Sequence, residues 1–156
     1  ETANGAGDAS TFNSSEGVLY AELSIDANDG NFRFLSLSNG NSNNQNVVWI
    51  YYRPDVNQIN FRVIVGGVSS FDDIYTINNA TINHKLAIKY KTNDFSAYVN
   101  GVEVLTDNSG ATFSSNVLND LGFNRPDGIN NFYGNVKDVR VYNTALTDAE
   151  LIALTT

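Results

Sequence analysis

The feature that most constrains the fold of this chain is a set of short segments in which apolar and polar residues alternate. In segment 18–25 the residues Leu19, Ala21 and Leu23 are separated by Tyr20 and Glu22, which belong to the opposite strand face. Segments 32–38 and 59–65 show similar alternation. Side chains of a strand point alternately to its two faces, so this period of two predicts half-buried strands. About ten such strands, separated by turn-rich segments at intervals of 8–12 residues, predict an antiparallel sandwich of two sheets.

One short helix is predicted at the end of the chain. The strand-like run 136–142 is followed by Thr147 and, three residues later, by Glu150. This spacing is typical of a capping box, in which each side chain bonds the backbone amide of the other residue. Leu146 and Leu151 flank the cap and are placed to form a hydrophobic staple. We therefore expect the last strand to lead directly into a capped helix.

Two longer motifs are informative beyond their alternation. Residues 134–146 read GNVKDVRVYNTAL, and residues 84–104 contain two strand-like runs with an Asn100-Gly101 turn. The first motif resembles the closing strand of laminin-G-like domains of the concanavalin A-like lectin and glucanase superfamily, and the second resembles their central hairpin. The resemblance implies an all-β, antiparallel two-sheet jelly-roll sandwich with one short C-terminal helix. Because such domains are mostly binding modules, it also implies a binding function.

Composition predicts a single acidic domain. The chain has 156 residues, with 17 acidic and 9 basic side chains and a net charge of −8. We expect residues 1–10 to form a flexible arm or linker and residues 11–156 to form one domain. The charge argues against nucleic acid as a partner, and no apolar run approaches the roughly 20 residues that membrane insertion needs. The absence of cysteine excludes disulfides and thiolate metal sites.

The first candidate ligand site is the strand face turned away from the predicted core. If the alternation holds, Trp49 and Tyr51 stand side by side on this face, and Asn60 and Arg62 lie on the same face of the next strand. A sugar ring packs on flat aromatic side chains, and its hydroxyls bond polar groups around them. We therefore predict an exposed sugar platform on this face, which we expect to be concave. A register slip of one residue would instead bury Trp49 in the core.

The second candidate site is the loop edge of the sandwich. Two polar segments, both expected to be loops, supply the residues Asp72, Asp73, Tyr75, Asn124, Arg125, Asp127 and Tyr133. Laminin-G-like and related lectins often bind ligands at such an edge, so the resemblance favours a ligand site here. Turn formation alone also explains the abundance of Asn and Asp. Both interpretations stay open at this stage.

Calcium is left open by the sequence. Segment 26–31 superficially resembles a hard-cation loop and offers the oxygen atoms of Asp26 and Asp29, but it lacks the spacing of an EF-hand. The resembled family also uses an acidic residue of its closing strand at a structural calcium site. Here that position aligns with Lys137, which cannot bind calcium, and Asp138 is next to it. No cofactor is required, and a Ca²⁺ site would draw on Asp26, Asp29 or Asp138.

Catalysis is not predicted. The chain lacks the Glu-x-Asp-x-x-Glu pattern of hydrolases in the resembled superfamily, and its single histidine, His84, is expected at the surface. We predict a non-catalytic, lectin-like module that recognises a polysaccharide or a cell-surface glycan. We expect it to come from a secreted bacterial enzyme or a phage tail protein, and so to be extracellular or on a virion surface. The alternatives are a structural or adhesion domain that contacts another protein, and a polysaccharide hydrolase or lyase; the oligomeric state is left open.

Overall fold

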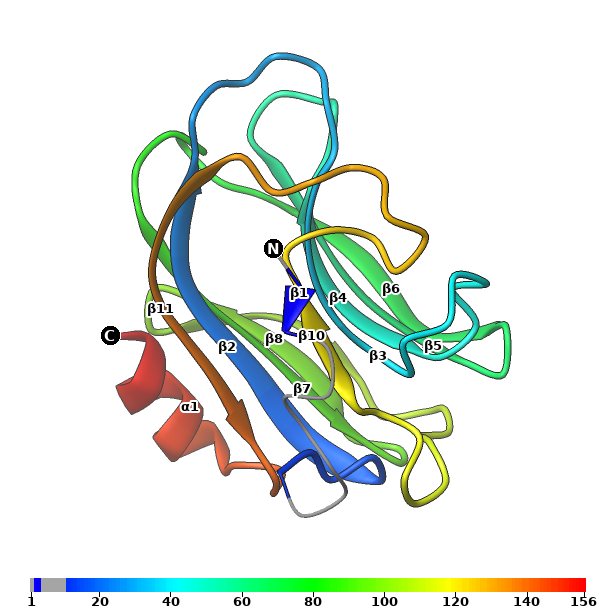
Figure 1. Ribbon diagram of the computed structural model, residues 1–156. Coiled ribbons are helices and arrows are strands. Elements are labelled where there is room, and N and C mark those ends of the chain that lie inside the picture. Colours follow the sequence, from blue (N-terminus) through cyan, green and yellow to red (C-terminus); the bar gives the residue numbers. More distant parts are fainter. Residues whose placement is uncertain (1, 4–10) are drawn as a thin grey trace.

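Two antiparallel sheets face one another in a jelly-roll-like sandwich, as the sequence predicted (Figure 1). The computed structural model describes residues 2–3 and 11–156. One sheet has six strands, in the spatial order β1 (Thr2–Ala3), β10 (Asp120–Gly122), β3 (Arg33–Ser38), β4 (Val47–Tyr52), β5 (Gln58–Val65) and β6 (Val68–Thr76). The other sheet has five, in the order β11 (Gly134–Tyr142), β2 (Glu16–Ile25), β7 (His84–Lys91), β8 (Phe95–Val99) and β9 (Val102–Asp107).

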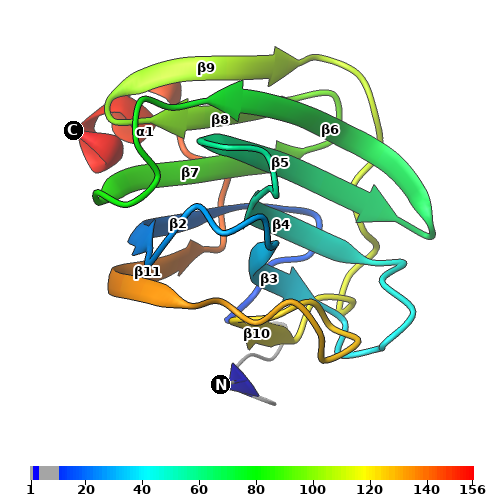
Figure 2. The same ribbon diagram turned by 90° about the horizontal axis from the view of Figure 1, so that it is seen from above.

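The core lies between the two sheets, which face each other in the view from above (Figure 2). It contains the alternate residues predicted from the sequence, such as Leu19 of β2, Leu35 of β3 and Phe61 of β5, each fully buried. Complete burial of one such side chain contributes about 1.5–3 kcal/mol. Since successive residues of a strand point to opposite faces, these positions also place the intervening residues on the outer faces.

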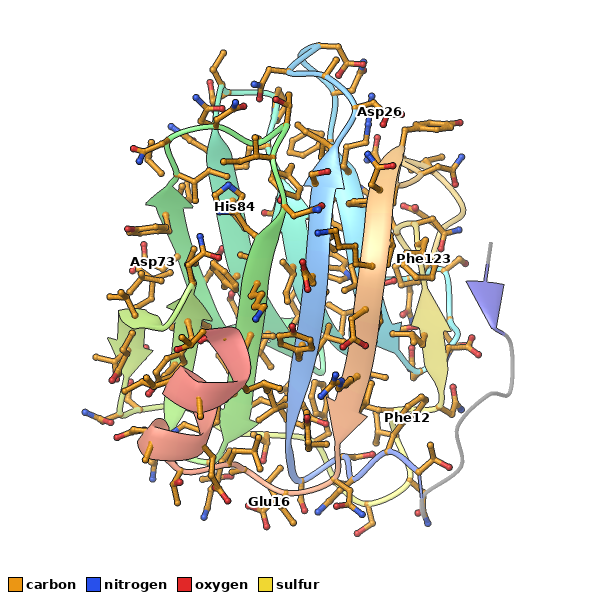
Figure 3. All side chains as sticks on the ribbon, turned by 90° about the vertical axis from the view of Figure 1, so that its left-hand side faces the viewer. Phe12, Glu16, Asp26, Asp73, His84 and Phe123 are labelled. Atoms are coloured by element: carbon orange, nitrogen blue, oxygen red, sulfur yellow. The ribbon has the colours of Figure 1, made fainter. Side chains whose placement is uncertain are left out.

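Helix α1 (Asp148–Thr155) lies against part of the outer face of the five-stranded sheet, over β7, β8 and β9 (Figure 3). The predicted capping box is confirmed: Thr147 N donates to Glu150 Oε2 at 2.8 Å, and Glu150 N donates to Thr147 Oγ1 at 3.4 Å. Leu151 is fully buried against Tyr98 and other residues of the sheet, and Leu146 packs on the same cluster. The helix therefore covers one part of this outer face. Among the described residues, no helix lies on the outer face of the six-stranded sheet.

The prediction that His84 lies at the surface is wrong. His84 is the first residue of β7 and is only 6% exposed, and its position is labelled in Figure 3. Its Nε2 lies 2.8 Å from Asn79 O, and its Nδ1 lies 2.9 Å from Asn100 Nδ2. The polar sequence around His84 suggested exposure, but the adjacent loop and the Asn100-Gly101 turn close over the ring. Both residues of the predicted turn have positive φ angles, +49° and +81°, as a type I′ turn requires.

One predicted segment assignment also differs from the structure. Asp72, Asp73 and Tyr75 were expected in a loop, but they belong to β6, an edge strand of the six-stranded sheet. Of the predicted arm 1–10, residues Thr2 and Ala3 pair with β10, and the remainder lies outside the described residues. The consecutive polar residues of β6 suggested a loop. An edge strand can carry such residues because its outer side is exposed to solvent.

Candidate functional site

A row of polar and aromatic residues crosses the outer face of the six-stranded sheet. The ladder pairs Gly122 with Ser36, Ser36 with Trp49, Trp49 with Arg62, and Arg62 with Asp72. These positions alternate with core residues along their strands, so they share the face opposite the core. The fold thus brings together Trp49, Arg62 and Asp72, which the sequence had divided between two sites.

A second row lies beside the first on the same face. Phe34 pairs with Tyr51, and Tyr51 pairs with Asn60. The rings of Phe34 and Tyr51 stack at a centroid distance of 4.3 Å, and Tyr51 Oη donates to Asn60 Oδ1 at 2.7 Å. Burial, and then the charge of Asp72, raises the pKa of Tyr51. The phenol therefore remains a hydrogen-bond donor at neutral pH.

The aromatic residues of this face are packed rather than exposed. Trp49 and Tyr51 point away from the core as predicted, but each is only 5% exposed. They form a cluster with Phe34, Val47 and Ile64, in which the ring of Trp49 meets that of Phe34 edge-on at 5.1 Å. The expectation of an open aromatic platform is therefore wrong. The alternation predicted which face of the sheet Trp49 lies on, but not that neighbouring side chains would bury its ring.

The indole N–H of Trp49 has no hydrogen-bond partner among the described residues, although it is buried. An unpaired buried donor costs about 1–3 kcal/mol, and such groups are uncommon in folded proteins. A hydroxyl or water oxygen beside this nitrogen would recover that free energy. Because the packed cluster encloses the nitrogen, an acceptor reaches Trp49 Nε1 only after the side chains around it move.

The charged residues of the face are held in a fixed network. Asp72 Oδ1 accepts a hydrogen bond from Asn60 Nδ2 at 2.9 Å, and Asp72 Oδ2 lies 3.2 Å from Arg62 Nε. The side chains of Arg62 and Asp72 are 33% and 38% exposed. Arg53 Nη1 donates to Asn60 Oδ1 at 3.4 Å and its Nη2 lies 3.5 Å from Asp55 Oδ2. Asn60 therefore connects both arginines to the buried phenol of Tyr51.

A polar hollow of about 220 Å³ lies next to the first row, between β3 and β10. Its lining residues are Ser36, Ser38, Gly40, Asp120, Gly122, Asn124 and Pro126. Ser36 Oγ donates to Asn124 O at 2.6 Å and so ties the following loop to the sheet. Clefts for drug-sized ligands are usually about 300–1,000 Å³, so this hollow suits a small polar unit such as one sugar ring.

The loop after β10 is anchored beside this hollow by ion pairing. Asp127 pairs with Arg125 and accepts a hydrogen bond from Asn44 Nδ2 at 3.1 Å. Burial acts to raise the pKa of Asp127, but the hydrogen bonds from Arg125, Asn44 and the Ile129 amide outweigh it and lower the pKa. Arg125 was predicted to meet a ligand, and the structure places it in this anchor.

Two predicted site residues lie away from both rows. Tyr75 pairs with the core residue Ile59 and lines a separate hollow that also includes His84. Tyr133 is 57% exposed, and the cation over its ring is Arg33, 5.2 Å from the centroid. The structure therefore does not combine Tyr75 and Tyr133 into one loop-edge site.

The candidate calcium ligands do not converge among the described residues. No group of three or more His, Asp or Glu side chains that could hold a metal ion occurs in this part of the chain. Asp29 lies 2.6 Å from Arg33, Asp138 lies 2.5 Å from Arg140, and Lys137 pairs with Glu22 at 3.1 Å. A hydrogen bond from the Asn31 side chain is the main cause that lowers the pKa of Asp29. Calcium binding stays a prediction.

Comparison with known proteins identifies the class and then the family. The fold is that of an antiparallel jelly-roll-like sandwich with one helix against an outer face. The family model of the concanavalin A-like lectin/glucanases superfamily matches residues 3–152, and the chain belongs to this superfamily. No curated protein sequence matches it significantly. None of the helices in the described residues is long and apolar enough to span a bilayer.

Several solved structures share the fold at low sequence identity. The CBM40 module of the Ruminococcus gnavus IT-sialidase, bound to α2,3-sialyllactose, has a TM-score of 0.73 and 20% identity, with 91% of this chain and 83% of that chain covered. The leech intramolecular trans-sialidase gives a TM-score of 0.71 and 22% identity, and the match covers 91% of this chain and 23% of that chain. A pentraxin from Limulus polyphemus gives 0.64 and 16%, covering 91% and 70%. These similarities show the fold.

Proposed function

We propose that this protein is a non-catalytic carbohydrate-binding module that recognises a polysaccharide or cell-surface glycan on the outer face of the six-stranded sheet. The observation that carries the proposal is the unpaired indole N–H of Trp49, directly across the ladder from Ser36 of the polar hollow. A sugar hydroxyl would accept from this N–H once the side chains packed around it move, and other hydroxyls of the sugar would bond the polar lining of the hollow. The similar R. gnavus module, whose structure contains a bound sialyllactose, supports the same class of ligand.

The carboxylates on this face favour a binding role over hydrolysis, because they do not form the pair of groups that hydrolysis needs. Glycoside hydrolysis needs one carboxyl group to protonate the leaving oxygen and another to attack or activate water. Both oxygens of Asp72 are engaged, by Asn60 and by Arg62. Among the described residues that line the hollow, Asp120 is the only carboxylate, so a second one to share the reaction is missing there. We infer that the module attaches a larger secreted bacterial enzyme or a phage tail protein to its glycan, outside the cell or on a virion.

The test is a binding screen of uncharged and acidic oligosaccharides and polysaccharides, followed by calorimetry on every positive. Trp49→Phe keeps an aromatic ring in the cluster and removes the N–H, so we expect about three- to tenfold weaker binding from the loss of one hydrogen bond. Lys91→Gln, on the opposite sheet with a half-exposed side chain, is the matched control and should bind normally. Absence of binding to the whole panel, or an unchanged affinity in Trp49→Phe, would contradict the proposal.

The same screen tests calcium. Each positive is repeated after dialysis against a chelator and again with added Ca²⁺. The carboxylates considered as calcium ligands are paired with arginines, so we expect binding without the ion. Loss of binding in chelator, restored by Ca²⁺, would establish a metal requirement.

A further inference from the structure

We infer that Asp72 sets the class of sugar that this face accepts, by occupying Arg62 and so favouring uncharged glycans over carboxylated ones. The inference rests on the proposed function and concerns its ligand. It separates this chain from the R. gnavus module, whose structure holds an acidic sugar, sialyllactose.

The geometry around Asp72 is that of a built-in carboxylate partner. A ligand carboxylate is recognised by charge-assisted hydrogen bonds from a guanidinium. In this protein Asp72 Oδ2 forms an ion pair with Arg62, 3.2 Å from a Nε–H that makes no hydrogen bond among the described residues, while its Oδ1 accepts from Asn60 Nδ2 at 2.9 Å. Asn60 is itself held by the phenol of Tyr51 at 2.7 Å. An incoming carboxylate would have to compete with a carboxylate that the fold already positions.

The surrounding charges act in the same direction. The arginines that border this face each lie beside an aspartate: Arg53 with Asp55, Arg62 with Asp72, and Arg125 with Asp127. The hollow adds Asp120, and the chain as a whole carries a net charge of −8. Negative ligands are therefore repelled at long range as well as at the site. The lining of the hollow is otherwise polar, with the hydroxyls of Ser36 and Ser38 and the carboxylate of Asp120, and such groups are suited to neutral sugar hydroxyls.

The experiment compares wild type, Asp72→Asn and the double variant Asp72→Asn/Arg62→Gln. Asparagine is isosteric with aspartate and its Oδ1 still accepts from Asn60, so the network keeps its shape. The probes are 3′-sialyllactose, lactose, and gluco-, xylo-, manno- and galacto-oligosaccharides, measured by calorimetry at low and high salt. Near-ultraviolet circular dichroism of each variant verifies that the face is folded.

We expect the wild type to bind an uncharged oligosaccharide, with little salt dependence, at least tenfold more tightly than sialyllactose. Asp72→Asn should gain at least tenfold in affinity for sialyllactose, and Arg62→Gln in the same chain should abolish that gain. A wild type that prefers sialyllactose, or an Asp72→Asn protein with unchanged affinity for it, overturns the inference and leaves the proposed function standing. Failure of every probe to bind overturns both.

Discussion

Lys89 on β7 and Asp148 in the first turn of α1 join the helix to the sheet, with Lys89 Nζ 3.4 Å from Asp148 Oδ1. The Lys89 side chain is only 7% exposed, and a second carboxylate, Asp94 Oδ1, lies 2.6 Å from the same nitrogen. Tyr98 Oη donates to Asp148 Oδ1 at 3.0 Å. Burial, followed by the bond to Asp148, raises the pKa of Tyr98, so the phenol stays protonated.

This arrangement predicts strong coupling between the two carboxylates. A buried ammonium without a partner costs about 3–5 kcal/mol, whereas one remaining carboxylate still compensates it. Asp94→Asn and Asp148→Asn should each be mild in urea unfolding, and the double variant should lose at least 1 kcal/mol more than their sum. Adding Lys89→Met to the double variant should recover stability. Additive losses would show that neither carboxylate compensates Lys89.

The capping box gives a second prediction. Thr147→Ala removes the oxygen that accepts the Glu150 amide, and loss of such a cap costs about 1 kcal/mol of stability. The measurement is the free energy of unfolding in urea. Thr147→Ser retains the oxygen and is the control. Equal losses in both variants would mean that the methyl group, rather than the cap, stabilises α1.

The pKa of Asp127 gives a pH prediction. Its pKa is lowered in the folded protein, below the ordinary value of 3.8, so its contribution to stability is present above that value and is lost as the pH falls through the folded-state pKa. Thermal unfolding between about pH 5 and pH 2 should show a decline that is shallower in Asp127→Asn. Asn44→Ala removes one of the donors and should give an intermediate slope. Identical slopes in all three proteins would exclude the Asp127 anchor as a cause.

Gly134 at the start of β11 gives a packing prediction. A Cβ atom at this position would collide with the backbone oxygen of Ser24 and lie 2.9 Å from Ile25 Cα. Backbone atoms of β2 cannot move aside without disturbing the sheet, so Gly134→Ala should cost about 1–3 kcal/mol. Asn135→Ala, the exposed neighbour, is the control. A neutral Gly134→Ala variant would show that the two strands have room to separate.

Trp49 gives an optical prediction because it is the single tryptophan of the chain. With 5% of its surface exposed, its fluorescence should resemble that of an apolar environment and resist quenching by iodide. A ligand that bonds Nε1 should change the emission. Strong quenching by iodide in the folded protein would show that the aromatic cluster opens in solution.

The strand faces were predictable because burial follows a period of two. Leu35 and Phe61 face the core, and Trp49 and Arg62 face outward, as the alternation required. The cap at Thr147 was predictable for a similar reason, since its spacing is local. Local rules therefore gave most of the fold.

The remaining features depend on contacts between distant segments. Ser36 faces outward in its strand, but nothing local indicates that β10 pairs beside it and forms the polar hollow. The burial of His84 depends on the Asn100 turn, 16 residues away. The sequence prediction put Asp72 in a loop. In the structure it pairs with Arg62 across the β5–β6 hairpin, and the register of this hairpin was not predicted.

The edge strand β6 has a consequence for solubility. An uncovered edge offers free backbone groups to other chains, and charged side chains are a common protection against such association. Asp72 and Asp73 are exposed on β6, and Glu103 is exposed on β9, at the edge of the other sheet (Figure 3 labels Asp73). These charges therefore oppose strand pairing between copies of the protein along the two edges. A variant without the Asp72 charge loses part of this protection and should aggregate at lower concentration.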